Sequence, residues 1–139
     1  MIRITDYCES MQNESDAPPG MKPLAPRTTA FAKEVRRFVK QIPYSRKIID
    51  DCEQLVRASG SVGANYVEAN DSLGKQDALY HIRICRKEAK ESFYWLDMLL
   101  EQIPVSLIDE CKRLMKECDE LIRIFTKISK TMEAQISSK

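Results

Sequence analysis

The 139-residue sequence has little of what builds strands, tight turns and catalytic centres. It contains four glycines and one histidine, and aromatic residues make up 7% of it. So few glycines argue against the repeated hairpin turns of an all-β fold. A single histidine leaves poor material for a zinc site, and we therefore expect no metal and no cofactor.

Long apolar runs are missing as well. No stretch approaches the roughly 18 residues that a membrane-spanning helix needs. The first residues lack the continuous apolar segment of a signal peptide. We therefore expect a cytoplasmic protein with no membrane partner.

The charges nearly cancel, with 22 basic and 21 acidic residues and a net charge of +1. This balance argues against a protein that binds polyanions over its whole surface, although local basic patches remain open. The five cysteines form no Cys-x-x-Cys pair. Four of them fall on apolar helical stripes, where a free cysteine behaves as a small hydrophobic residue: Cys52, Cys85, Cys111 and Cys118.

Catalytic motifs are absent too. The sequence contains no glycine-rich phosphate loop, no nucleophile elbow and no Glu-x-x-His pair of the kind that builds di-iron sites. The lone His81 is typical of a surface or interface group on a helix. We predict no catalytic residues and no small-molecule substrate, and an enzyme would have to reveal itself by a metal or cofactor in the purified protein.

The first 26 residues do not resemble a folded segment. Residues 13–20 are polar and end in Pro-Pro-Gly, and Pro23 and Pro26 follow. Such a stretch buries too little apolar surface to offset its ordering entropy. We predict a disordered tail over residues 1–26 and one domain over residues 27–139, and Met21 remains an alternative start.

Every later segment has the pattern of an amphipathic helix. Apolar residues recur at spacings of three and four, in strict heptads from Leu107 to Met132. Thr28 or Thr29 is the expected first N-cap, and Pro43 and Pro104 end two of the helices. Short links predict an all-α, up-down-up-down antiparallel four-helix bundle, with an extended array of helical hairpins as the alternative. The expected helices cover residues 28–41, 45–70, 73–102 and 106–136.

The segment 55–69 places two glycines inside the second expected helix. Because each costs about 1 kcal/mol relative to alanine, we expect them to permit close approach by another helix of this chain or of a second copy. Wide apolar edges on the second and third expected helices favour self-association. The residues that we predict at a subunit interface are Arg57, Gly60, Gly63, Asn65, Tyr66, Glu68, Tyr94 and Trp95.

A basic stripe follows the third expected helix. Arg83, Arg86, Lys87 and Lys90 have the spacing i, i+3, i+4, i+7 and share one face, which would suit a phosphate backbone. The alternative is a solvated face that neighbouring glutamates partly neutralise. A second basic surface on the first expected helix completes the candidate nucleic-acid contacts: Arg36, Arg37, Lys40, Arg83, Arg86, Lys87 and Lys90.

Two blocks carry a family resemblance. They are Arg57-x-x-x-Ser61-Val62-Gly63-Ala64-Asn65-Tyr66-x-Glu68-Ala69 and the run from Cys85 to Leu96, and Thr28-x-x-Phe31-Ala32 also fits. Over about residues 27–130 the chain resembles the four helix bundle protein family, also called the 23S rRNA intervening-sequence protein family.

This resemblance implies a short bundle that assembles as a ring-like homopentamer. Relatives are encoded within insertions in bacterial 23S rRNA genes, and the accessory protein of diversity-generating retroelements has the same fold. That accessory protein forms a basic pentamer that engages reverse transcriptase and nucleic acid. We expect a non-enzymatic, homo-oligomeric scaffold or accessory protein with RNA or a nucleic-acid-processing protein as partner. The alternative is a protein-interaction module that binds no nucleic acid.

Overall fold

The computed structural model describes residues 23–138, and the statements that follow concern that part of the chain. It contains four α-helices and no β-strand in those residues, so the predicted all-α class is confirmed. A single 3-10 turn, η1, precedes the last helix. The elements are α2 (Leu24–Gln41), α3 (Ile49–Asn70), α4 (Lys75–Leu100), η1 (Val105–Leu107) and α5 (Ile108–Ser137).

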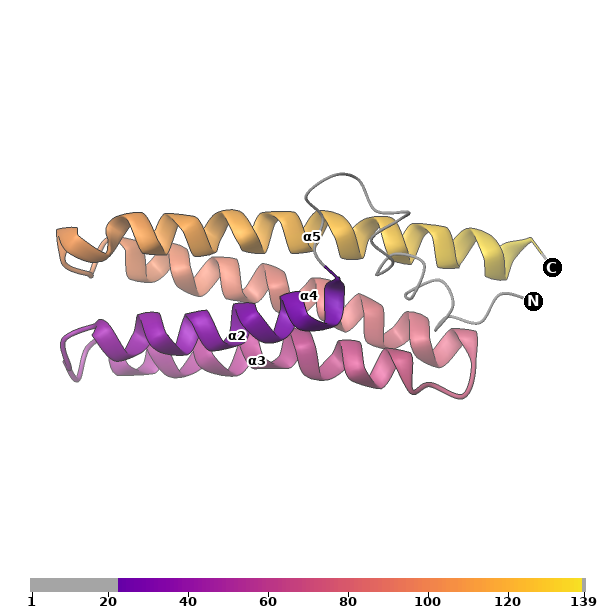
Figure 1. The fold of residues 1–139 in the computed structure, drawn as a ribbon, viewed down its shortest axis with the longest axis horizontal. Coiled ribbons are helices and arrows are strands. Elements are labelled where there is room, and N and C mark those ends of the chain that lie inside the picture. The colour runs from indigo at the N-terminus through magenta and orange to yellow at the C-terminus, as the bar shows by residue number, and fades with distance from the viewer. Residues whose placement is uncertain (1–22, 139) are drawn as a thin grey trace.

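The four helices lie along one long axis (Figure 1). The α2–α3 and α4–α5 connections are at one end of the molecule, and the α3–α4 connection is at the other. α4 packs against both α3 and α5, whereas α2 packs mainly on α3 and touches α5 little. With 18 residues against 30, α2 is about 27 Å long and α5 about 45 Å, so α2 starts part-way along the bundle (Figure 1).

The first described helix begins earlier than predicted. α2 starts at Leu24 rather than near Thr28, so residues 24–26 of the predicted tail are helical, and residues 1–22 of it lie outside the described residues. Pro23 occupies the N-cap and Pro26 the first turn, where no intrahelical N–H bond is lost. The predicted cap at Thr28 is wrong, because Thr28 is buried and its hydroxyl donates to the Ala25 carbonyl at 3.1 Å.

Relative to prediction, α3 and α5 begin later, and α4 is shorter at both ends. α3 begins at Ile49 rather than Ser45, because the preceding residues form a turn in which the Ser45 hydroxyl accepts from the Lys47 N–H at 3.2 Å. α4 begins after Gly74 and ends at Leu100. Pro104 introduces η1, and its carbonyl accepts from the Leu107 N–H at 2.9 Å.

The core runs the length of the bundle and confirms the predicted apolar stripes. All four helices contribute to it, and Tyr66 and Phe125 meet in it with ring centroids 6.2 Å apart. Burial raises the pKa of the Cys111 thiol to about 11, so this cysteine is an inert core residue near neutral pH. The heptad positions of α5, together with the last residue of η1, are all buried: Leu107, Cys111, Leu114, Cys118, Leu121, Phe125, Ile128 and Met132.

The two glycines of α3 meet α2 of the same chain. A Cβ at Gly63 would lie 3.3 Å from the Thr28 hydroxyl oxygen and 3.7 Å from the Thr28 carbonyl carbon. A Cβ at Gly60 would lie 2.9 Å from a guanidinium nitrogen of Arg36. The close approach expected from the glycines is therefore made by α2, which decides between the two partners that the sequence left open.

Candidate functional site

The basic stripe of α4 forms a shallow hollow of about 310 Å³. Its lining consists of Arg83, Arg86, Lys87 and Lys90, so the structure brings together the four cations that the sequence grouped. Arg83 pairs with Glu133 of α5 at 3.0 Å. The other three have no carboxylate within ion-pair distance among residues 23–138. The hollow is therefore a concentration of uncompensated positive charge.

The Nε atom of Arg86 strengthens this description. It is buried and has no hydrogen-bond partner within the described part of the chain. A buried donor without an acceptor costs stability, and such groups are uncommon in folded proteins. The Arg86 side chain therefore has an unpaired polar atom next to the hollow that it lines.

The glutamates of α4 face away from this hollow. Both glutamates form ion pairs with Arg57 of α3. The distance from the Arg57 guanidinium to the Glu88 carboxylate is 3.3 Å, and the Glu91 carboxylate is closer. The hydrogen bond from Arg57 lowers the pKa of Glu91. Burial raises the pKa of Glu88, although the positive charge of Arg57 acts in the opposite direction. One guanidinium serves two carboxylates here, and the charge of Lys87 also acts to lower the pKa of Glu88, so partial neutralisation of the stripe stays a prediction.

α5 adds cations that the sequence analysis overlooked. Arg123, Lys127 and Lys130, with two threonines, line a second open hollow of about 400 Å³. Arg123 pairs with Asp119 on its own helix at 3.1 Å. Because Glu133 binds Arg83, this stretch of α5 lies beside the stripe of α4. The spacing i, i+4, i+7 of these three cations was the signal for this row, and residues 121–132 contain no acidic residue.

The basic residues of α2 lie on a different part of the molecule. Arg36 folds back along its helix, donating to the Ala32 carbonyl at 2.9 Å, and covers Gly60. Arg37 and Lys40 are exposed, but α2 packs on α3 and α5 rather than on α4. A single chain therefore does not merge the two predicted basic surfaces.

The predicted interface residues are divided by the structure. Gly60 and Gly63 contact α2 as described, and Tyr66 is fully buried in the core rather than on an edge. Tyr94 is 53% exposed and Trp95 is half-buried beside it. The packing within one chain thus accounts for three of these eight positions, and the subunit interface stays a prediction for the others.

Several of the remaining positions gather along the outer α3–α4 edge. Arg57 bridges to α4 as described. Asn65 donates to the Ser61 carbonyl at 2.9 Å, and its side-chain oxygen lies 3.1 Å from Nδ1 of His81 on α4. Glu68 is exposed and forms no ion pair within residues 23–138. His81 is therefore a link between two helices.

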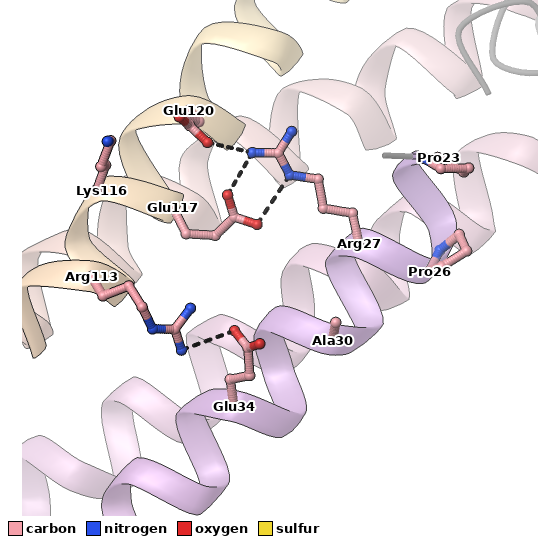
Figure 2. Close-up of a pocket in the computed structure, with 9 residues that line it drawn as sticks. All are labelled: Pro23, Pro26, Arg27, Ala30, Glu34, Arg113, Lys116, Glu117 and Glu120. Carbon is pink, nitrogen blue, oxygen red and sulfur yellow. Dashed lines mark hydrogen bonds and ion pairs between the residues drawn. The ribbon is translucent and has the colours of Figure 1, made fainter. Parts of the chain in front are cut away.

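The groove between α2 and α5 contrasts with the α4 hollow (Figure 2). It has a volume of about 560 Å³, and ion pairs cross it. Arg27 reaches Glu117 at 2.5 Å and Glu120 at 2.6 Å, and Arg113 reaches Glu34 at 3.3 Å. Cations and carboxylates compensate one another here, so the groove offers no excess charge to a ligand.

The described residues provide no material for a metal centre or a membrane span. No group of three or more His, Cys, Asp or Glu side chains within residues 23–138 is arranged to hold a metal ion. In the same residues, no helix combines the length and apolarity needed to cross a bilayer.

A family model described as 23S rRNA-intervening sequence protein matches residues 25–127 of the chain. This match confirms the resemblance that the two sequence blocks carry. No curated protein matches.

A solved crystal structure shares the fold. It is a protein of unknown function from the S23 ribosomal protein family of Bacteroides thetaiotaomicron, with a TM-score of 0.67 and 24% sequence identity. The similarity covers 76% of this chain and 97% of that one. At this identity it supports the fold alone, and neither description names a catalytic activity.

Proposed function

Because the chain belongs to the 23S rRNA-intervening sequence protein family, we propose that it is a non-enzymatic accessory protein that assembles with itself and associates with nucleic acid. Each copy is an up-down-up-down four-helix bundle, and the family resemblance favours a homopentamer. The protein works in the cytoplasm, with no small-molecule substrate. Its nucleic-acid contacts are made by the α4 hollow.

The observation that carries this proposal is the uncompensated charge of Arg86, Lys87 and Lys90. Cations that have carboxylate partners in the folded chain gain little by exchanging them for phosphates. Cations without such partners release counterions from a phosphate backbone and gain affinity. The row on α5 enlarges the same surface, and several copies in one assembly would multiply weak contacts.

The α3–α4 edge is the surface that we propose for self-association. It contains Arg57, Asn65, Glu68 and Trp95, and the exposed Ala64 allows a second helix to approach. This edge lies on the side of α4 away from its contact with α5, so self-association leaves the basic hollow open.

Binding to a structured RNA over a series of salt concentrations tests the nucleic-acid part. Affinity should fall steeply as salt rises, and the charge reversals Arg86→Glu and Lys87→Glu should abolish binding. The matched control is Arg113→Glu in the compensated α2–α5 groove, which should bind as the wild type does. Absence of binding at low salt would overturn this part of the proposal.

Light scattering on the purified protein tests the assembly. We expect a mass near five times the 16.0 kDa of one chain. Ala64→Glu places a charge on the proposed edge and should lower the mass, whereas Val105→Glu, at an 85% exposed position in η1, should not. A monomeric wild type would contradict self-association.

The second candidate is a protein-interaction module without nucleic acid. The exposed apolar side chains Tyr80, Tyr94 and Met98 on α4 favour it. A stable assembly combined with no RNA binding at any salt concentration would select this alternative.

A further inference from the structure

Two exposed tyrosines flank the basic row of α4. Tyr80 is 60% exposed and Tyr94 is 53% exposed, both unusually open for such large rings. With Arg83, Lys87 and Lys90 between them, they follow the spacing i, i+3, i+7, i+10, i+14. This heptad spacing keeps all five side chains on one face of the helix.

The two rings are held in place by their neighbours in the sequence. Tyr80 meets His81 edge-on with ring centroids 5.3 Å apart, and Tyr94 meets Trp95 in the same way at 5.0 Å. His81 is itself placed by the contact with Asn65. An ordered ring loses little conformational entropy when a flat ligand stacks on it.

We propose that this face of α4 binds single-stranded nucleic acid, with bases stacking on Tyr80 and Tyr94 and the phosphate backbone following the cations between them. The inference rests on the proposed nucleic-acid association and names the form of nucleic acid that the site takes. We call the five residues the Tyr80–Tyr94 row.

The chemistry of the row distinguishes a single strand from a duplex. Proteins that bind single strands combine a basic track with aromatic rings, because every unpaired base offers a π-face. In a duplex the bases are already stacked on one another, so their faces are not available to the tyrosine rings. A purely basic surface would serve a duplex equally well, and it is the pair of exposed tyrosines that selects the single strand.

The dimensions of the row suit a short segment of strand. Fourteen residues separate the two tyrosines along α4, which corresponds to about 21 Å of helix. The buried Nε atom of Arg86 lies beside the row, where it lacks an acceptor in the described residues. The phosphate backbone would pass along the exposed cations between the tyrosines, Arg83, Lys87 and Lys90.

Fluorescence anisotropy with a labelled 12-nucleotide oligouridine and a hairpin duplex of similar length tests the proposal on the full chain. The single strand should bind more tightly than the duplex. Tyr80→Ala and Tyr94→Ala should each weaken binding of oligouridine about fivefold or more, whereas Tyr80→Phe and Tyr94→Phe should retain it. Tyr44→Ala is the matched control, because Tyr44 is 81% exposed but lies outside α4.

The salt dependence separates stacking from charge. The tyrosine variants should keep the wild-type slope of log affinity against log salt concentration, while Lys90→Ala should reduce it by about 0.7. If Lys90→Ala weakens binding but neither tyrosine variant does, or if the duplex binds more tightly, the inference is overturned and the proposed function stands. If neither probe binds at low salt, both fail.

Discussion

The α2–α5 groove and the α4 hollow differ in how their charges are arranged. On the α2 side, Arg27 and Arg113 each meet carboxylates from another helix (Figure 2). On the α4 side, only Arg83 of the basic stripe does so, through Glu133. A chain with a net charge of +1 therefore carries both charge-compensated and basic surfaces.

This difference shows why overall charge is a poor guide to partners. The near-neutral composition argued against a polyanion-binding protein. In the fold, however, the carboxylates are used up where they bridge helices, as in the contacts of Arg57 with Glu88 and Glu91. Cations without such partners remain on the outer side of α4 and α5, and Arg37 and Lys40 remain exposed on α2.

Gly63→Leu should have the largest effect, because it separates α2 from α3 and so removes the compensated groove. The added side chain would meet the backbone of Thr28, and we expect a loss of about 3 kcal/mol in the free energy of unfolding. Denaturant unfolding measures it. Gln54→Leu, at an exposed position of the same helix, is the control, and equal stability of the two variants would show that the α2–α3 contact is not close.

Arg27→Ala should produce the next largest loss. Its side chain is only 12% exposed, and its removal leaves the partly buried Glu117 without its cation. We expect the free energy of unfolding to fall by about 2 kcal/mol with no change in nucleic-acid affinity. Arg123→Ala breaks only the exposed pair with Asp119 and should cost less than about 0.5 kcal/mol. Equal losses of unfolding free energy in Arg27→Ala and Arg123→Ala would contradict the claim that the ion pairs of the α2–α5 groove stabilise the fold more than the exposed pair on α5.

The double change Arg86→Glu and Lys90→Glu should have the opposite signature. Nucleic-acid affinity should fall at least tenfold, which is about 1.4 kcal/mol. The free energy of unfolding should stay within about 0.5 kcal/mol of the wild-type value. Filter binding and thermal melts on the same preparations measure both quantities. Loss of stability without loss of binding would mean that these cations support the fold rather than a ligand.

The pH dependence of Glu91 should give the smallest effect. Arg57 lowers the pKa of Glu91 below its ordinary value of 4.5, so this ion pair stabilises the protein at neutral pH. The stabilisation is lost as the pH falls below about 4.5 and through the lowered pKa. Glu91→Gln should cost about 0.5 kcal/mol at pH 7 and nothing once the carboxylate is protonated in the folded wild type. Urea unfolding at several pH values measures the difference, and a constant difference down to acidic pH would disprove the role of this pair.

Glu88 should behave in the opposite way. Burial raises its pKa, so its ionised form costs stability above that raised pKa, and the cost is relieved as the pH falls. In urea unfolding at neutral pH, Glu88→Gln should therefore raise the free energy of unfolding, whereas Glu91→Gln should lower it.

The helices and their buried stripes could be predicted because local spacing determines them. The start of α2 could not, because Pro23 and Pro26 are usually helix breakers but are tolerated in a first turn. The glycines predicted a close contact but not its partner, since both a neighbouring helix and a second copy satisfy the same requirement.

The candidate site was predicted only in part. The α4 stripe follows from helical spacing alone. Arg57 forms ion pairs with Glu88 and Glu91 across the α3–α4 contact. These pairs depend on how α3 and α4 are aligned, which cannot be read from the spacing within one helix. The cations of α5 also follow helical spacing, but their position beside α4 depends on how α4 and α5 are aligned.

The most direct test is the salt dependence of nucleic-acid binding by the wild type and by the triple variant Arg86→Ala, Lys87→Ala and Lys90→Ala. If these three residues contact phosphates, the slope of log affinity against log salt concentration should become shallower by about two for a single strand. An unchanged slope, or a wild-type affinity that does not depend on salt, would contradict the assignment of α4 as the nucleic-acid surface.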